Sequence, residues 1–349
     1  MRIALLTYST RPRGGVVHTL ALAEALAALG EEAEVWALGR GGDRRFHRDV
    51  RVPVHIVDCP DVPGETVGER VLRSIGLLRD AFTPSAYDVV HAQDCITANA
   101  AGCCVRTVHH LDHFTTPELA ACHERALVEP FAHVCVSSAV AAELSAGWGI
   151  AASVIPNGVD AARFATADGS AWRDRFGAYV LTVGGIEPRK GSLDLLEAAA
   201  LLPEYPLVVA GGETLFDYRG YRAAWDSRAA ELGVEPVVLG PVPHDDLPGL
   251  VAGAAAFAFP STKEGFGLAA MEALAAGVPL VVRDLAVFRE VFTGAALFAT
   301  DPASLAAALR EAVTVPSPER VANGKALAAR HTWRRAAEAH LEFYRAHVR

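Results

Sequence analysis

The chain has 349 residues, of which 51% are hydrophobic and 21% are charged, so it has room for two domains and is too apolar to be disordered. Its formal net charge of −9 argues against a duplex-DNA binder, because such proteins present a strongly basic domain. The N-terminal apolar run ends at Leu6, too early for a signal peptide, and no later run is long enough to span a membrane. We therefore expect a cytoplasmic globular protein with no nucleic-acid partner and no integral membrane segment.

The cysteines gather in the first half of the chain, and no pair has the C-x-x-C spacing of a metal site or a redox motif. We expect them to be buried and reduced, as in a cytosolic protein. They are Cys59, Cys95, Cys103, Cys104, Cys122 and Cys135.

Short β-branched runs alternate with longer segments rich in alanine and leucine, a pattern that predicts parallel sheets in an α/β fold. In the first half we expect strands at residues 3–6, 33–38, 52–57, 89–91, 105–109 and 134–137, with a turn at Gly14-Gly15 before a helix at 17–28.

The pattern then restarts. We expect strands at 179–184, 207–210, 237–239, 256–259 and 280–282, with helices at 193–202 and 268–276. Pro156 and the Asn157-Gly158 turn mark the boundary between a domain at 1–156 and a second at 157–332. Residues 333–347 predict an amphipathic helix. Two open α/β domains imply a cleft, lined by loops at the carboxyl ends of the strands.

Three loops at the carboxyl ends of predicted strands contain residues that suit ligand binding or catalysis. Gly14-Gly15 leads into a helix, where backbone amides and the helix dipole suit a phosphate, although a plain tight turn uses the same residues. The spacing is not G-x-G-x-x-G, so a nicotinamide cofactor is disfavoured. Arg189-Lys190 follows Gly184-Gly185, and two adjacent cations there can neutralise a diphosphate. The alternative is a solvated basic pair.

The third loop contains Glu264, followed by a glycine-rich turn, and Glu272 lies further along the predicted helix. Both carboxylates can accept hydrogen bonds from sugar or ribose hydroxyls. The amides at the helix start suit phosphate or sugar oxygens. The alternative, an acidic turn that stabilises the helix dipole, accounts for Glu264 but not for Glu272.

The remaining polar features have weaker interpretations. His109-His110 ends a predicted strand, where a histidine can contact a substrate, although a structural role is the more common one. His91, His113 and His123 are expected to be structural. The arginine-rich stretch 40–51 predicts a solvated loop, with an acidic acceptor or a lipid headgroup as the alternative ligand.

Together these motifs resemble the family-4 retaining glycosyltransferases of the GT-B fold, and the resemblance covers nearly the whole chain. It rests on the glycine loop, the 107–109 strand end, the 154–160 linker, the 184–191 loop and the Glu264–Glu272 pair. The implied fold is two Rossmann-like domains facing across a cleft, an acceptor-side domain at 1–156 plus 333–349 and a donor domain at 157–332. The C-terminal helix would cross back to the first domain.

The resemblance also implies roles for residues. Arg189 and Lys190 would bind the nucleotide diphosphate, Glu264 the donor sugar, Glu272 the ribose, and His109 the sugar near its reacting carbon. The other implied donor-binding residues are Gly14, Gly15, Gly185, Gly265, Phe266, Gly267 and Leu268. This chain departs from the family pattern at two places. A second histidine, His110, stands where the family commonly has an aspartate, and bulky residues stand before Glu290 where the family commonly has a glycine-rich loop.

The implied reaction moves a hexosyl group from a UDP- or GDP-sugar to a small-molecule, glycan or lipid-linked acceptor, with retention of anomeric configuration. The chain contains no D-x-D triplet, so we expect no metal and no cofactor beyond the donor. Three alternatives stay open: a GT-B phosphorylase or nucleotide-sugar epimerase, a nucleotide-sugar-binding protein without catalysis, and a dinucleotide-dependent oxidoreductase.

Overall fold

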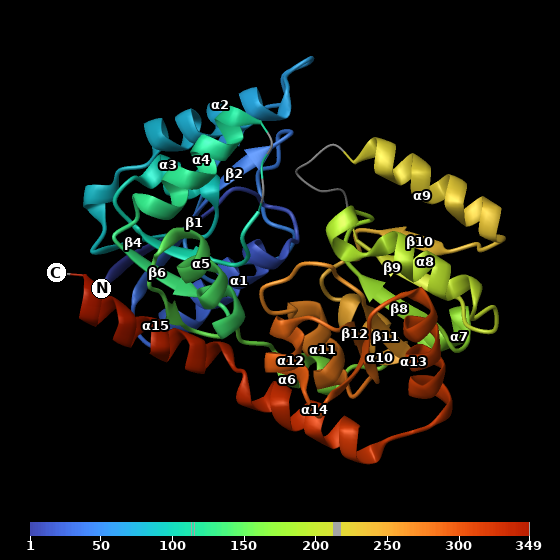
Figure 1. Ribbon diagram of the computed structural model, residues 1–349. Coiled ribbons are helices and arrows are strands. Elements are labelled where there is room, and N and C mark those ends of the chain that lie inside the picture. The colour runs from blue at the N-terminus through green and yellow to red at the C-terminus, as the bar shows by residue number, and fades with distance from the viewer. Residues whose placement is uncertain (113, 115, 212–217, 349) are drawn as a thin grey trace. The chain divides into compact units, whose positions relative to one another are not determined.

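The computed structural model describes residues 1–112, 114, 116–211 and 218–348, which divide into two compact units (Figure 1). Unit 1 comprises Met1–Gly158 and Trp333–Arg349, and unit 2 comprises Val159–Thr332. The chain therefore completes most of unit 1, builds unit 2, and returns to unit 1 with its last helix.

Unit 1 is built on a seven-stranded sheet in the order β3-β2-β1-β4-β5-β6-β7, with every neighbouring pair parallel. Its strands are β1 (Arg2–Thr7), β2 (Glu32–Arg40), β3 (Val54–Cys59), β4 (Val89–Ala92), β5 (Val105–Val108), β6 (Ala132–Cys135) and β7 (Ser153–Val154).

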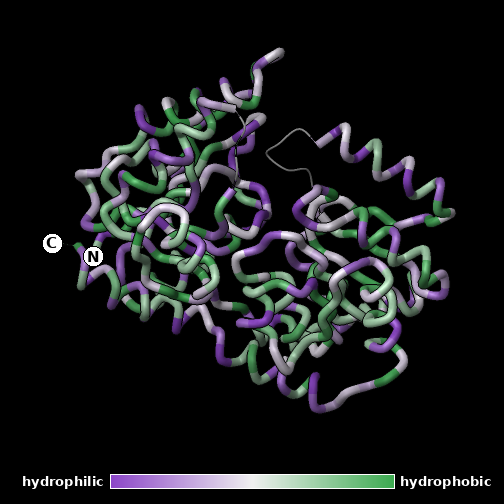
Figure 2. The backbone as a smooth tube through the Cα atoms, viewed as in Figure 1, coloured by the Kyte–Doolittle hydropathy of each residue, from purple (hydrophilic) through white to green (hydrophobic). Residues whose placement is uncertain are grey.

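Helices cover both faces of this sheet. In β1, Ile3 and Leu5 join one hydrophobic cluster with α1 and α15, while Ala4 and Leu6 join another with α2 and α3. The helices of unit 1 are α1 (Gly14–Ala28), α2 (Val67–Ala81), α3 (Cys95–Ala101), α4 (Pro117–Val128), α5 (Ser138–Trp148) and α15 (Trp333–His347), with a 3-10 turn at Pro84–Ala86. Hydrophobic and hydrophilic residues alternate along α15 (Figure 2).

Unit 2 has a six-stranded parallel sheet in the order β10-β9-β8-β11-β12-β13. Its strands are β8 (Val180–Val183), β9 (Leu207–Ala210), β10 (Val237–Gly240), β11 (Ala256–Phe259), β12 (Leu280–Arg283) and β13 (Ala296–Ala299). The central strands β9 and β11 are buried on both faces, as parallel strands between helices require, whereas the edge strand β10 is only partly buried.

The helices of unit 2 pack on this sheet and on one another. One core joins α8, α9 and α13 to the strands, and α11 packs against α6 and α14. They are α6 (Ala161–Ala165), α7 (Ser170–Phe176), α8 (Ser192–Ala200), α9 (Arg219–Leu232), α10 (Leu247–Gly253), α11 (Leu268–Ala276), α12 (Ala286–Phe292), α13 (Pro302–Thr314) and α14 (Pro318–Arg330), with a 3-10 turn at Pro188–Lys190.

The structure confirms the predicted parallel sheets and the helices at α11 and α15, and it corrects three details. Gly14 and Gly15 form the first turn of α1 instead of a turn before it. Cys103 is exposed, because it follows the end of α3, whereas the other cysteines are buried or half-buried. The stretch 40–51 is not uniformly solvated, since Arg40 belongs to β2 and Arg48 pairs with Glu24 at 2.7 Å.

Candidate functional site

In each unit the direction of winding reverses at one pair of neighbouring strands, β1 and β4 in unit 1 and β8 and β11 in unit 2. Loops that follow such strands diverge at their carboxyl ends, which is where open α/β sheets bind ligands. In unit 2 the loop after β8 carries Arg189 and Lys190, and the loop after β11 carries Glu264. Residues 75 positions apart thus meet at one edge of the sheet.

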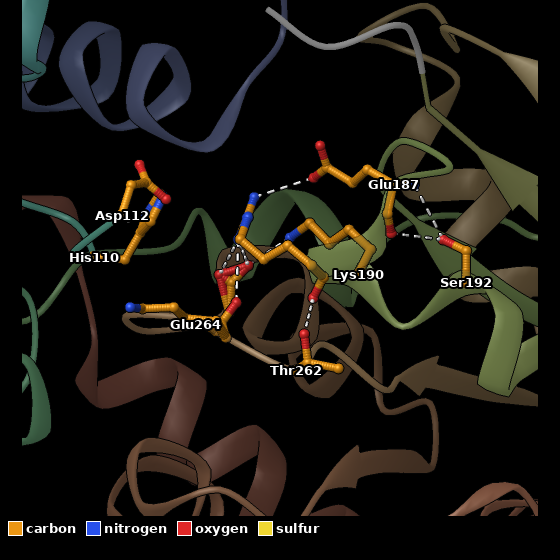
Figure 3. Close-up of polar contacts among 9 residues, drawn as sticks. His110, Asp112, Glu187, Lys190, Ser192, Thr262 and Glu264 are labelled. Carbon is orange, nitrogen blue, oxygen red and sulfur yellow. Dashed lines mark hydrogen bonds and ion pairs between the residues drawn. The ribbon is translucent and has the colours of Figure 1, made fainter. Parts of the chain in front are cut away.

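Arg189 and Lys190 converge on the Glu264 carboxylate. Arg189 Nη1 donates to Glu264 Oε1 at 2.9 Å, and Lys190 Nζ donates to the same oxygen at 2.5 Å. In Figure 3 the Lys190 ammonium points toward Glu264. The three side chains are only 28%, 18% and 11% exposed, so these charge-assisted bonds are stronger than pairs in open water.

A second carboxylate also holds Arg189. Glu187 Oε1 accepts from Arg189 Nη2 at 3.2 Å, and the Glu187 side chain is 9% exposed. Glu187 is not among the predicted site residues, although its place in the loop between Gly185 and Arg189 offered a signal. The guanidinium group therefore lies between two carboxylates, and its orientation is fixed before any ligand binds.

Backbone contacts join the two loops that carry these side chains. The Thr262 amide donates to the Arg189 carbonyl at 2.8 Å. Gly191 has φ +65°, and a Cβ there would lie 2.3 Å from the Pro260 carbonyl oxygen, so only glycine permits this approach. The Lys190 methylenes pack on Gly184, and its ammonium lies 5.0 Å from the Phe259 ring centroid. Gly184, Gly185 and Lys190 also line a pocket beside β8.

The glycine-rich segment after Glu264 forms the start of α11. Gly267 is the N-cap in a left-handed conformation, and no acidic side chain lies in the first turn. Its neighbours Gly265 and Phe266 are buried, and the Phe266 ring lies 5.6 Å from the His331 ring. The first amides of α11, including that of Leu268, have no partner within the helix, so they can donate to a ligand.

Glu272 lies within α11, in different surroundings from Glu264. Burial raises the pKa of its carboxyl to about 7, while the nearby Arg163 lowers it and Asp160 raises it. A carboxylate in this environment gains most from a ligand that donates hydrogen bonds. Arg163 donates a hydrogen bond to the His244 carbonyl, and the sequence pattern did not indicate that it lies near Glu272.

The remaining predicted site residues belong to unit 1. His109 directly follows β5, and its Nε2 lies 3.1 Å from Gln93 Oε1, which follows β4. A Cβ on Gly15 would lie 3.8 Å from the His109 ring, whereas Gly14 has open space. Gln93, which is not among the predicted site residues, is buried and follows β4, the strand that lies between β5 and the switch-point partner β1.

The two adjacent histidines differ in their surroundings. Burial, followed by repulsion from Arg106 and His110, lowers the pKa of His109 well below its usual value, so its imidazole is neutral at pH 7. His110 Nε2 lies 3.3 Å from Asp112 Oδ1 (Figure 3). Because the His109 ring lies beside Gly15, His109 is the histidine next to the start of α1.

The other histidines and Glu290 lie in these places. His91 is buried between Tyr344 and Thr107, and His123 Nδ1 lies 3.2 Å from Cys95 Sγ, in keeping with structural roles. His113 lies outside the described residues. Glu290 is exposed on α12. Among the described residues, none of the helices is long and apolar enough to cross a bilayer.

Two doubly wound parallel sheets, each with polar loops at its switch point, are the architecture of the GT-B fold. The glycosyltransferase family 4 model matches residues 12–163, and the model of group 1 glycosyl transferases matches residues 174–328. The chain belongs to this glycosyltransferase family and is a transferase. The predicted resemblance to the family-4 glycosyltransferases of the GT-B fold is thereby confirmed.

Similar proteins agree with this assignment. O-antigen chain mannosyltransferase B of Escherichia coli is 36% identical over 43% of this chain and 40% of its own length. Phosphatidyl-myo-inositol mannosyltransferase of Propionibacterium freudenreichii is 27% identical over 95% of this chain and 92% of its own. The structure of Anabaena HepE in complex with UDP-glucose has a TM-score of 0.79 at 20% identity, covering 99% of this chain and 100% of that one.

Proposed function

We propose that the protein is a retaining glycosyltransferase that moves a hexosyl group from a UDP- or GDP-sugar to its acceptor without a metal ion. The observation that carries the proposal is the convergence of Arg189 and Lys190 on Glu264 at the switch point of unit 2. Two cations fixed in one place suit a diphosphate, whose negative charge grows as it leaves the sugar.

The cation pair acts through electrostatics. In the ligand-free site Glu264 compensates part of the charge of Arg189 and Lys190. A bound diphosphate takes over hydrogen bonds from both cations, which leaves Glu264 oxygens to accept from sugar hydroxyls. Because the two cations are largely withdrawn from water, their effect on the leaving diphosphate exceeds that of exposed charges.

The proposal assigns the other donor contacts as well. Glu272 accepts from the ribose hydroxyls, and the amides at the start of α11 donate to donor oxygens. In unit 1 the first turn of α1 at Gly14 and Gly15 offers amides to a diphosphate. His109, being neutral, serves as a hydrogen-bond partner for the sugar and not as a proton donor. The leaving phosphate then takes the acceptor proton on the face that it vacates.

The similar proteins support the donor class. Anabaena HepE was solved with UDP-glucose, and two of the similar curated proteins are named mannosyltransferases, which makes a hexosyl nucleotide the first donor to test. A cytoplasmic location is part of the proposal, since the six cysteines are free thiols, as a reducing compartment keeps them.

A thermal-shift panel of UDP-, GDP- and ADP-sugars tests the donor site, because a ligand that binds only the folded state raises the melting temperature. We expect a shift with one nucleotide class in the presence of EDTA. The absence of a shift with every nucleotide sugar, with and without Mg²⁺, would overturn the proposal, and a shift only with Mg²⁺ would overturn its metal independence.

The reaction itself separates the proposal from its alternatives. With the donor that binds, we expect the new glycosidic bond to have the anomeric configuration of that donor, as read by NMR. A phosphorylase would cleave a disaccharide with phosphate and ignore nucleotide sugars, and an epimerase would change the donor sugar without an acceptor. A binding protein would give no turnover in either the native chain or a Glu264→Ala variant.

A further inference from the structure

Arg283, the last residue of β12, connects the segments that carry the proposed donor site, although it belongs to neither of their loops. Its guanidinium group binds three separate parts of unit 2. Nε donates to the Pro260 carbonyl at 2.8 Å, Nη1 donates to the Thr300 carbonyl at 3.2 Å, and Nη2 forms an ion pair with Asp194. The side chain is 15% exposed. Every nitrogen of this guanidinium group therefore donates within the protein.

Two of these three partners belong to the segments that carry the site residues. Pro260 directly follows β11 and begins the loop that leads to Glu264. Asp194 lies in the first turn of α8, the helix that comes after Arg189-Lys190. Arg283 therefore joins the start of the Glu264 loop to the helix that continues the loop of the two cations.

The surroundings of the guanidinium group fix its position. A Cβ on Gly191 would lie 3.2 Å from Arg283 Nη2, so the guanidinium group lies close to the backbone that directly follows Lys190. The third partner, Thr300, precedes α13, and its amide donates to Ser304 Oγ at 3.0 Å. Arg283 is thus bound both to the site loops and to a part of unit 2 that carries no predicted site residue.

The contacts of Arg283 differ from those that Glu264 makes with the two cations. In the proposed reaction a diphosphate takes over hydrogen bonds from Arg189 and Lys190, which weakens the ion pairs between the two loops. The bonds of Arg283 are made to protein groups alone, so they persist when the donor binds. Together with the bond from the Thr262 amide to the Arg189 carbonyl, they hold the two loops at their ligand-free spacing.

We propose that Arg283 is a positioning residue of the transferase, which keeps the Arg189-Lys190 loop and the Glu264 loop at a fixed spacing while the donor diphosphate replaces the ion pairs between them. A guanidinium group suits this role, because its donors form a rigid planar fork that can bond several segments at set angles. A misplacement of about 1 Å can cost about 10²-fold in rate. The inference rests on the proposed function, because it concerns the same donor site.

Steady-state kinetics with the donor found in the thermal-shift panel test the proposal. Arg283→Met removes all three contacts and should lower kcat/KM by about 10- to 100-fold at a temperature well below unfolding. Arg283→Lys keeps the charge beside Asp194 but not the fork, so it should retain part of the activity. Arg283→Lys also decides the test if Arg283→Met does not fold. A native kcat/KM in the folded variant would overturn the proposal.

Arg310 on α13 supplies a matched control in the same unit. Its Nη2 donates to the Leu201 carbonyl at 2.6 Å, and its Nε donates to Glu204 at 3.2 Å, so it also binds a carbonyl and a carboxylate. Neither partner lies in the loops of the site. Arg310→Met should therefore change kcat/KM by less than about twofold, whatever its effect on the melting temperature. An equal loss in Arg283→Met and Arg310→Met would mean that general destabilisation, and not positioning, causes the loss.

A double-mutant cycle shows whether Arg283 acts through the two cations. In a chain that already carries Lys190→Ala, the spacing of the loops matters less, because one of the positioned groups is absent. The combined loss in kcat/KM should therefore be smaller than the product of the two single losses. A combined loss equal to that product would mean that Arg283 acts independently of Lys190, and it would overturn the assignment.

Hydrogen exchange separates this inference from the proposed function, because it needs no substrate. The Thr262 amide, which donates to the Arg189 carbonyl, reports the spacing of the two loops. We expect it to exchange about tenfold faster in Arg283→Met and at the native rate in Arg310→Met. If the native chain turns over no nucleotide sugar, the proposed function fails, and the exchange rate still decides whether Arg283 holds the loops. Native exchange at Thr262 in a folded Arg283 variant refutes the positioning role alone.

Discussion

Lys190 carries the sharpest prediction at the scale of single residues. Lys190→Ala removes one of the two cations at Glu264 and leaves the Arg189–Glu264 bond in place. We expect kcat/KM to fall by about 10²- to 10³-fold, the usual loss when one group that stabilises a developing charge is removed. Steady-state kinetics with the donor found in the thermal-shift panel provide the measurement.

Lys325 on α14 supplies a matched control for that experiment. It is exposed, and Lys325→Ala removes the same charge from the same unit. We expect its kcat/KM to stay within about twofold of the native value, since charges separated by solvent are screened. A comparable loss in both variants would mean that net charge, and not the position of Lys190, matters.

Glu272 predicts a pH dependence of donor binding. Its pKa of about 7 lies above the usual range because the carboxyl is buried. Ribose hydroxyls donate better to the ionised form, so the donor Kd should be constant above pH 8 and rise as the pH falls below 7. Calorimetry with a nucleotide sugar measures this without interference from a terminal phosphate, whose second pKa is about 6. In Glu272→Gln the affinity should be weaker and the dependence absent.

The residues of the candidate site differ in how far the sequence could predict them. Arg189, Lys190 and Glu264 lie in loops that follow recognisable strands, so their meeting at one sheet edge follows from the α/β pattern alone. Glu187 lies in the same loop as Arg189 and could have been found there, whereas Gln93 and Arg163 have no comparable signal, because their positions depend on which side chain the folded chain places beside them.

At the scale of elements, apolar periodicity predicted the buried strands and helices best. The segments α11 and α15 begin and end where the pattern placed them. Helix α2 was missed, although Val71, Ile75 and Leu78 have helical spacing and a capping box at Thr66 and Glu69 begins it. Its many charged residues obscure a narrow apolar stripe, so composition outweighed periodicity at this segment.

The start of α11 depends on a glycine. Gly267 has φ +95°, and a Cβ there would lie 3.2 Å from Phe292 and 3.3 Å from Phe259. Gly267→Ala should therefore destabilise unit 2 by about 1–3 kcal/mol, measured by urea unfolding. In contrast, Gly220→Ala in α9 meets open space in a helix and should be neutral or stabilising by up to about 1 kcal/mol. Equal destabilisation by both would contradict the strain argument.

A buried hydrogen bond joins helix α15 to the unit 1 sheet. The Tyr344 hydroxyl lies 2.6 Å from His91 Nδ1, whose other nitrogen is 2.7 Å from Thr107 Oγ1. Tyr344→Phe leaves the buried His91 nitrogen without its partner, which should cost about 1–3 kcal/mol of unit 1 stability in urea unfolding. Tyr205→Phe removes a hydroxyl that forms no hydrogen bond with the described residues of unit 2, and it should change stability by less than about 0.5 kcal/mol.

At the scale of the whole molecule, the two units differ in their buried titratable groups. Unit 1 contains a group of histidines from three elements and the loop after β5: His18, His91, His340 and His109. Their rings lie close together, with centroids 4.9 Å apart for His18 and His109 and 5.6 Å apart for His91 and His340. Unit 2 has only His244 and His331, neither of them buried. Lowering the pH should therefore destabilise unit 1 more than unit 2.

The direction of this effect follows from the pKa shifts. Burial lowers the pKa of His18, His91 and His109 well below 6.5 and that of His340 to about 4. A histidine whose pKa is lowered by folding stabilises the folded state above the unfolded pKa, and this stability is lost as the pH falls below about 6.5. Each such histidine removes about 1.4 kcal/mol for every pH unit below that value, until its folded pKa is reached.

Unit 1 should therefore unfold before unit 2 when the pH is lowered from 7 toward 4.5. Limited proteolysis along this pH series, with fragments identified by mass spectrometry, should yield a resistant fragment within residues 159–332. His340→Leu removes one titrating ring, whose Nε2 is buried without a partner among the described residues, and should shift the unit 1 transition to lower pH. His347→Gln removes an exposed ring on the same helix and should leave the transition unchanged. Simultaneous loss of both units, or an equal shift in the two variants, would show that the buried histidines do not set the acid limit, because the linkage requires the response to follow burial and not histidine content.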